Sequence, residues 1–286
     1  MVSGASAFLP LDLTGLRVAI TGAASGIGRV MADGFTACGG RVFISDVDAA
    51  ALAASGHDGM IADAGEAAAM EAFVDGAVTR LGGLDVLVNN AGIAGPTAPV
   101  ERVTPAELEE TLRVDLAAMF HCSRRAVQAL RAAGGGSIVN LSSAAGRFGF
   151  ALRSPYAAAK WGVVGFTKTL AIELGPDCIN VNAILPGLVD GPRIRRVLKA
   201  KAEANGGERA NRARPEHGVA PLLRHPARHR EYGALPLQPL RAHHQRPSHQ
   251  RGRRHTGPDV TASRAEPPPL DERKCRGPLS VRRSSP

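Results

Sequence analysis

The apolar positions in the first two thirds of this chain follow two alternating patterns. Short continuous apolar runs are typical of strands that are buried on both faces, and they lie at residues 17–21, 41–45, 59–62, 84–88, 136–141 and 179–185. The segments between them carry apolar residues three and four positions apart, which predicts helices, most clearly at residues 27–37, 66–81 and 155–174. Thr104 and Pro105 supply the cap and first-turn proline of a further helix. Strands that alternate with helices predict an α/β fold with a doubly wound parallel sheet.

This pattern stops near residue 206, and the composition changes with it. Residues 207–286 contain no Ile, Phe, Trp or Met and carry 17 Lys and Arg against 7 Asp and Glu, while the whole chain has 35 against 26. The positive excess therefore belongs to this tail, and the nearly neutral remainder gives no reason to expect binding to nucleic acid. Because the tail cannot build a packed core, we expect residues 11–206 to form a single domain and residues 207–286 to be disordered.

The genetic code offers a cause for the change in composition. Residues 228–239 can be encoded so that the next reading frame spells an amphipathic helix, and residues 241–256 continue in that frame as a turn and a buried strand. We therefore interpret residues from about 207 onward as a frameshifted, non-native translation, which retranslation of the coding DNA would test. The sheet would then lack its last strand.

Cysteine usage and hydropathy restrict the class of protein further. The four cysteines form no C-x-x-C pair, so neither a zinc site nor a disulfide framework is predicted. No basic segment precedes the first apolar stretch, and no apolar run approaches the ~18 residues that a membrane span requires. We therefore expect a cytoplasmic protein without a bound metal and without a membrane partner.

A glycine-rich segment, Thr21-Gly-Ala-Ala-Ser-Gly-Ile-Gly28, joins the first strand to the first helix. Its glycines let the backbone approach a pyrophosphate, which predicts dinucleotide binding, although a tight turn without a ligand uses the same residues. Asp46, which ends the second strand, can accept hydrogen bonds from both ribose hydroxyls and would repel a 2′-phosphate, so it favours NAD over NADP. A helix cap or solvated acid is the alternative for Asp46. Asp63 can accept a hydrogen bond from adenine or serve as an ordinary loop acid.

Three polar side chains are spaced for proton transfer. Tyr156 and Lys160 are four positions apart, so a helix places them on one face. A free phenol titrates near pH ~10 and is a poor base at neutral pH, but an adjacent ammonium and a positive nicotinamide ring favour the phenolate. Ser143, in the loop after the fifth strand, can donate a hydrogen bond to the substrate oxygen. A surface pair would explain Tyr156 and Lys160 alone, whereas Ser143 and the glycine segment together favour catalysis.

A further motif, Asn89-Asn90-Ala91-Gly92, follows the fourth strand at the edge where doubly wound sheets bind ligands. An Asn-rich turn explains this motif equally well. Taken with the others, it makes the chain resemble the classical short-chain dehydrogenase/reductase family from about Leu11 to Ala204.

The resemblance implies a Rossmann fold and an NAD(P)-dependent oxidoreductase that interconverts a secondary alcohol and a ketone, working as a homodimer or homotetramer. It implies that Ser143, Tyr156 and Lys160 are catalytic. The residues that it implies for cofactor binding are Gly22, Ser25, Gly26, Ile27, Gly28, Asp46, Asp63, Asn90, Ala91, Gly92, Tyr156, Lys160, Pro186, Gly187, Leu188 and Val189.

Three features depart from the family pattern. The slightest is Asp190-Gly191-Pro192-Arg193, which stands where the family often has a Thr four residues after Gly187. Asp115 stands where the family usually has an asparagine that completes a water-linked proton relay to Lys160. It brings a charge and loses a donor but can still hold a water, so we expect an altered pH dependence and count it with the catalytic residues. The tail replaces the family's last strand, part of its substrate pocket and a dimer contact, so we expect poor stability and impaired oligomerisation. A 3-oxoacyl-thioester reductase and a catalytically dead cofactor-binding protein are the alternative functions.

Overall fold

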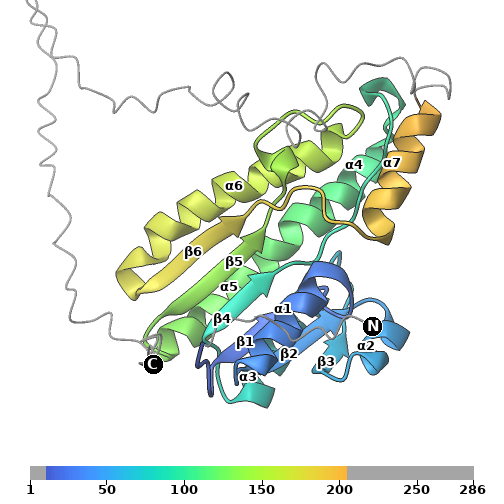
Figure 1. The fold of residues 1–286 in the computed structure, drawn as a ribbon. Helices are drawn as coiled ribbons and strands as arrows, with labels where there is room; N and C mark the ends of the chain where they lie inside the picture. Colours follow the sequence, from blue (N-terminus) through green and yellow to red (C-terminus); the bar gives the residue numbers. More distant parts are fainter. Residues whose placement is uncertain (1–10, 205–286) are drawn as a thin grey trace, which may run out of the picture. The chain divides into compact units, whose positions relative to one another are not determined.

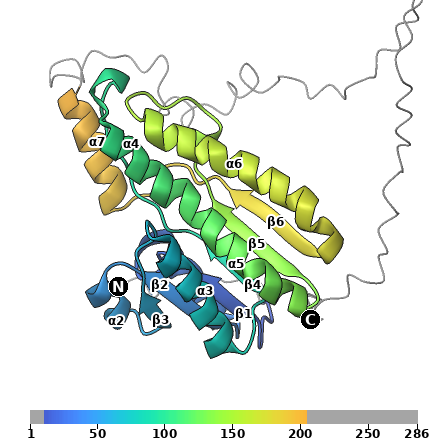
Figure 2. The same ribbon diagram turned by 180° about the vertical axis from the view of Figure 1, so that it is seen from behind.

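The computed structural model describes residues 11–204; the tail and the interpretation of it as a frameshift lie outside these residues. The central element is a parallel sheet with helices on both faces, shown from opposite sides in Figures 1 and 2. Its strand order is β3-β2-β1-β4-β5-β6. The strands are β1 (Arg17–Ile20), β2 (Arg41–Asp46), β3 (Asp58–Ile61), β4 (Val86–Asn89), β5 (Gly136–Leu141) and β6 (Ile179–Ile184). The predicted fold class is confirmed.

The direction of winding reverses between β1 and β4. From β1 the chain adds β2 and β3 on one side, then returns and adds β4, β5 and β6 on the other. In open α/β sheets, ligands bind at the carboxyl ends of the strands at this reversal. The loops after β1 and β4 are therefore the expected place for a site.

Helices connect the successive strands, and α7 follows the last of them. Seven α-helices lie in the described residues: α1 (Gly26–Ala37), α2 (Ala49–Ala54), α3 (Ala67–Leu81), α4 (Pro105–Leu112), α5 (Ala118–Ala132), α6 (Ser154–Leu174) and α7 (Pro192–Ala204). Thr104 caps α4, as the sequence predicted, and the structure adds a reciprocal capping box with Glu107. The apolar spacing did not predict α2, because its residues are almost all alanine and none is buried. A π-helical turn, Arg113–Ala117, separates α4 from α5.

The two faces of the sheet have separate cores. On one face, α3, α5 and α6 pack over a cluster that includes Phe73, Leu87 and Ile138, and these helices are in front in Figure 2. On the other face, α1 covers a cluster that includes Ile20 and Ile44. Because both faces are covered, β4 is buried along its whole length, which fixes the position of the loop that follows it.

Candidate active site

The glycine-rich turn after β1 is shaped by close backbone contacts. Gly22 has a φ of 61°, and a Cβ added there would lie 2.8 Å from Ala91 Cα. A Cβ at Gly28 would lie 2.6 Å from Gly22 O, so only glycine lets α1 begin this close to the turn. Ser25 gives α1 no side-chain cap, which leaves the first N–H groups of the helix for a ligand. A helix N-terminus of this kind suits a phosphate, so these residues fit the pyrophosphate of a dinucleotide.

The two predicted ribose and adenine acceptors lie at the ends of β2 and β3. Asp46 Oδ2 accepts a hydrogen bond from Ala24 N at 2.9 Å, and its Oδ1 accepts one from Asp48 N at 3.1 Å. This places the carboxylate beside the glycine-rich turn, as its predicted role requires. Asp63 Oδ1 accepts a hydrogen bond from Gly65 N at 2.7 Å, which is an ordinary loop contact.

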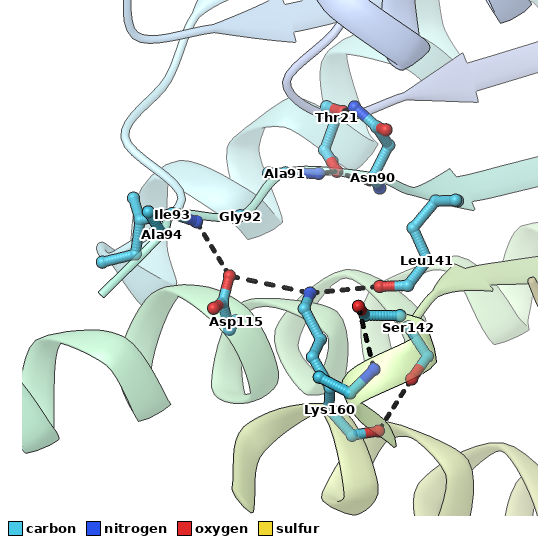
Figure 3. A network of polar contacts seen from close by, with 12 residues as sticks. Thr21, Asn90, Ala91, Gly92, Ile93, Ala94, Asp115, Leu141, Ser142 and Lys160 are labelled. Atoms are coloured by element: carbon cyan, nitrogen blue, oxygen red, sulfur yellow. Dashed lines mark hydrogen bonds and ion pairs between the residues drawn. The ribbon is translucent and has the colours of Figure 1, made fainter. Parts of the chain in front are cut away.

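Asn90 joins the loop after β4 to the glycine-rich turn. Its Nδ2 donates to Thr21 O at 3.0 Å and to Gly22 O at 2.7 Å. In return, Thr21 Oγ1 accepts hydrogen bonds from the backbone N–H groups of Asn90 and Ala91, each at 3.0 Å. Figure 3 shows this pair above the rest of the network. The amide of Asn90 thus fixes the relative position of two predicted cofactor-binding segments.

Lys160 is held in a buried position on α6. Its side chain is only 5% exposed, and Nζ donates to Leu141 O at 3.1 Å. Nζ also lies 3.6 Å from Asp115 Oδ1 and 5.6 Å from the centroid of the Tyr156 ring. Ser142 adds a hydrogen bond from its Oγ to Lys160 O at 2.8 Å. Figure 3 shows the ammonium between Leu141 and Asp115.

Asp115 lies in the π-helical turn and is completely buried. Its Oδ1 accepts a hydrogen bond from Ile93 N at 2.8 Å, while Oδ2 has no partner among the described residues. Burial raises the pKa of Asp115 and is the largest influence; the positive charge of Lys160 and the Ile93 hydrogen bond oppose it. A π-helical turn is frequent at functional sites because it re-aims a side chain, and here it lies where Asp115 meets Lys160.

The loops after β5 and β6 meet at Ser143. Ser143 precedes a short 3₁₀ turn, Ala144–Gly146, and its Oγ accepts a hydrogen bond from Ala145 N at 3.2 Å. Ala144 N donates to Pro186 O at 2.9 Å, so the Pro186-Gly187 segment is fixed next to the serine loop. The predicted loop residues therefore follow the carboxyl ends of the strands, while Tyr156 and Lys160 lie on α6.

The sequence analysis did not single out Arg153. This arginine is only 2% exposed, and its Cζ lies 4.8 Å from the centroid of the Tyr156 ring and 5.9 Å from that of Phe150. Its Nη2 donates to Ala94 O, and its Nε has no partner among residues 11–204. In the sequence, only its position three residues before Tyr156 connects Arg153 with the site, and this position does not show that the side chain is buried.

Neither a metal-binding cluster nor a membrane-spanning helix is present in the described part of the chain. Residues 11–204 contain no group of three or more His, Cys, Asp and Glu side chains placed to hold a metal ion. In the same residues, no helix is long and apolar enough to cross a membrane.

Comparison with known proteins finds relatives of this chain in sequence and in fold. Residues 17–202 match the family model described as short chain dehydrogenase. The cis-4-hydroxycyclohexanecarboxylate dehydrogenase of Sinomonas cyclohexanicum is 40% identical over 187 residues, which cover 62% of this chain and 75% of that protein. The crystal structure of levodione reductase matches with a TM-score of 0.64 and 34% identity, covering 67% of this chain and 79% of that one. Actinorhodin polyketide ketoreductase with NADPH matches with a TM-score of 0.63 and 34% identity, covering 66% and 76%.

Proposed function

Because the chain belongs to the short-chain dehydrogenase family, we propose that Ser143, Tyr156 and Lys160 carry its catalysis. The protein is an NAD(P)-dependent oxidoreductase that acts on the CH–OH group of alcohols and on the corresponding ketones. The observation that supports the assignment of residues is the fixed, buried ammonium of Lys160 on the helix that also carries Tyr156.

Each of the three residues has a distinct part in this proposal. Tyr156 takes the proton from the alcohol oxygen, or returns it to the ketone oxygen, by general acid–base catalysis. Lys160 stabilises the negative charge that develops on the phenolic oxygen, since its Nζ is 5.6 Å from the ring centroid. Ser143 donates a hydrogen bond that orients the substrate oxygen.

The cofactor supplies the redox chemistry. When it is bound, its nicotinamide accepts the hydride of the alcohol or delivers one to the ketone. We propose NAD as the preferred form, because the Asp46 carboxylate is held beside the glycine-rich turn and would repel a 2′-phosphate. The cofactor-binding set is otherwise the one predicted from the sequence.

Asp115 has a supporting part in the same proposal. It lies 3.6 Å from Lys160 Nζ, and its second oxygen has no partner among the described residues. That oxygen can accept a hydrogen bond from a water and so link Lys160 to a proton relay. The charged carboxylate of Asp115 would then hold the water that the side-chain amide of an asparagine usually holds in this family.

The test is Tyr156→Phe, which removes only the phenolic oxygen. We expect kcat to fall by about 10²- to 10⁴-fold with NAD binding retained, measured by NADH absorbance and by calorimetry. Ser154→Ala, an exposed substitution on the same helix, is the control and should keep the activity. A Tyr156→Phe protein with full activity would sink the assignment, and NAD binding without turnover by the natural chain would favour cofactor sensing.

A 3-oxoacyl-thioester reductase is the second candidate function. It is favoured by the similarity to actinorhodin polyketide ketoreductase, whose structure contains NADPH. Faster turnover of acyl thioesters with NADPH than of simple alcohols with NAD would select it. The family resemblance also leads us to propose residues 11–206 as the catalytic domain and a homodimer or homotetramer as the assembly, which sedimentation would measure.

A further inference from the structure

Arg153 is a buried cation without a directly paired carboxylate among residues 11–204. It forms no ion pair with a carboxylate of residues 11–204, and its Nε–H has no acceptor there. Arg17, by contrast, pairs with Asp85 at 2.7 Å although it is more exposed. Charged side chains are almost never buried unless they are paired, so the surroundings of Arg153 need an explanation.

The contacts that Arg153 does make compensate its charge incompletely. The Ala94 carbonyl is neutral, and the two aromatic rings at 4.8 and 5.9 Å offer only cation–π attraction. Burial is the largest influence and lowers the pKa of Arg153, while the attraction that Tyr156 and Asp115 exert on the guanidinium opposes this effect. A planar guanidinium with a free N–H is suited to a carboxylate, which it can bind through two hydrogen bonds.

The neighbouring charges make the region more positive still. Lys160 is buried, and α7 brings Arg193, which donates to Gly92 O at 2.7 Å, and Lys201, which lies 3.7 Å from the Phe150 ring centroid. The positive charge of Arg193 acts against that of Arg153, and Arg153 acts in the same way on Lys201. Asp115 is the one buried carboxylate facing this group among the described residues. An anion bound here would relieve the repulsion.

We propose that Arg153 binds the carboxylate of the substrate, so that the enzyme acts on hydroxy acids and the corresponding keto acids. The proposal rests on the proposed function, because it places the reacting oxygen at Tyr156 and the carboxylate a few bonds away. The carboxylate takes the free N–H of Arg153 and fixes the distance of the carbinol carbon from the phenol. Arg153 is thus a specificity-determining residue.

The helix α7 carries positive charge beside Arg153. The Arg153 side chain is buried, and its charge repels that of Lys201 on α7. Binding of an anion and close packing of α7 should therefore favour each other, because the anion screens Arg153 from Arg193 and Lys201.

A binding experiment tests the proposal without requiring turnover. Acetate, butanoate and cyclohexanecarboxylate are each compared with the corresponding amide by calorimetry, with the protein saturated with NAD and also without it. We expect at least one acid to bind about 10²-fold more tightly than its amide, and Arg153→Met to remove this preference. Arg147→Met, an exposed arginine on the preceding loop, should retain it. Equal binding of acids and amides to the natural protein would overturn the proposal.

A kinetic experiment separates the substrate proposal from the general function. The ratio of kcat/KM for 3-hydroxybutanoate and 4-hydroxypentanoate to that for their amides is measured in the natural protein, Arg153→Met and Arg153→Lys. We expect the ratio to fall about 10²-fold in Arg153→Met and less in Arg153→Lys, which keeps the charge. Equal loss on acids and amides would contradict a carboxylate site and indicate a role toward Tyr156. Absence of any turnover, with the acid preference in binding intact, would count against the proposed function alone. If Arg153→Met does not fold, the acid-over-amide preference is compared between the natural protein and Arg153→Lys, and that comparison decides.

Discussion

The substitution Asp115→Asn gives a direct measure of the electrostatics at Lys160. The variant keeps an oxygen for the Ile93 N–H, 2.8 Å away in the natural protein, and removes the charge that lies 3.6 Å from Lys160 Nζ. The pKa of Asp115 is raised above the ordinary carboxyl value of 3.8, because the cost of burial exceeds the attraction of Lys160. The folded protein therefore binds this proton more tightly than the unfolded chain does.

The sign of the pH dependence follows from this difference. Between pH 3.8 and the raised pKa, the folded state holds more protons than the unfolded state, so the free energy of unfolding falls as the pH rises. In the Asp115→Asn variant this side chain does not titrate, so it causes no such fall in the free energy of unfolding. The stability of the variant relative to the natural protein should thus increase with pH, at no more than about 1.4 kcal/mol per pH unit, because one group binds one proton.

Urea unfolding of both proteins from pH 4 to pH 8, followed by circular dichroism, measures this difference. Glu109→Gln, an exposed substitution on α4, controls for the loss of one negative charge. A difference that decreases with pH would show that the attraction of Lys160 exceeds the cost of burial and would refute the reasoning. The pH–rate profiles of the same proteins test the relay, and identical profiles would count against a role of Asp115 in it.

Two further predictions concern other carboxylates. Asp46→Ala should raise kcat/KM with NADP relative to NAD by about tenfold or more, because the repulsion between the carboxylate and the 2′-phosphate is removed. The measurement is the ratio of initial rates with the two cofactors. An unchanged ratio would contradict the proposed NAD preference. Asp85→Asn should destabilise the protein at pH 7 by roughly 2–3 kcal/mol. Burial alone would raise the pKa of Asp85, but its hydrogen bonds from Arg17 lower it overall. The difference in stability should therefore shrink as the pH falls below the ordinary value of 3.8 and disappear below the lowered pKa of the folded protein. The exposed substitution Asp58→Asn should cost little stability in the same denaturation assay.

Much of the fold follows from local pattern. Strands buried on both faces produce the largely apolar runs of β1, β2, β4 and β5, and glycines follow β1 and β4 where the chain turns. The candidate residues Tyr156 and Lys160 were recognisable because helical spacing alone puts them on one face. The helix α2 was not recognisable, because a stretch of alanines has no apolar face to detect.

The surroundings of the charged groups could not be predicted, because backbone atoms of one uncharged tripeptide organise them. Gly92 O accepts from Arg193, Ile93 N donates to Asp115, and Ala94 O accepts from Arg153. Residues 92–94 carry no reactive side chain and have no periodicity that marks them. Their position after β4, the strand beside the reversal of the sheet, brings backbone atoms of three successive residues to charged side chains from α7, the π-helical turn and the residue before α6. A change in how this loop leaves β4 would therefore affect the predicted proton relay and the proposed carboxylate site together, although neither set of side chains would have changed.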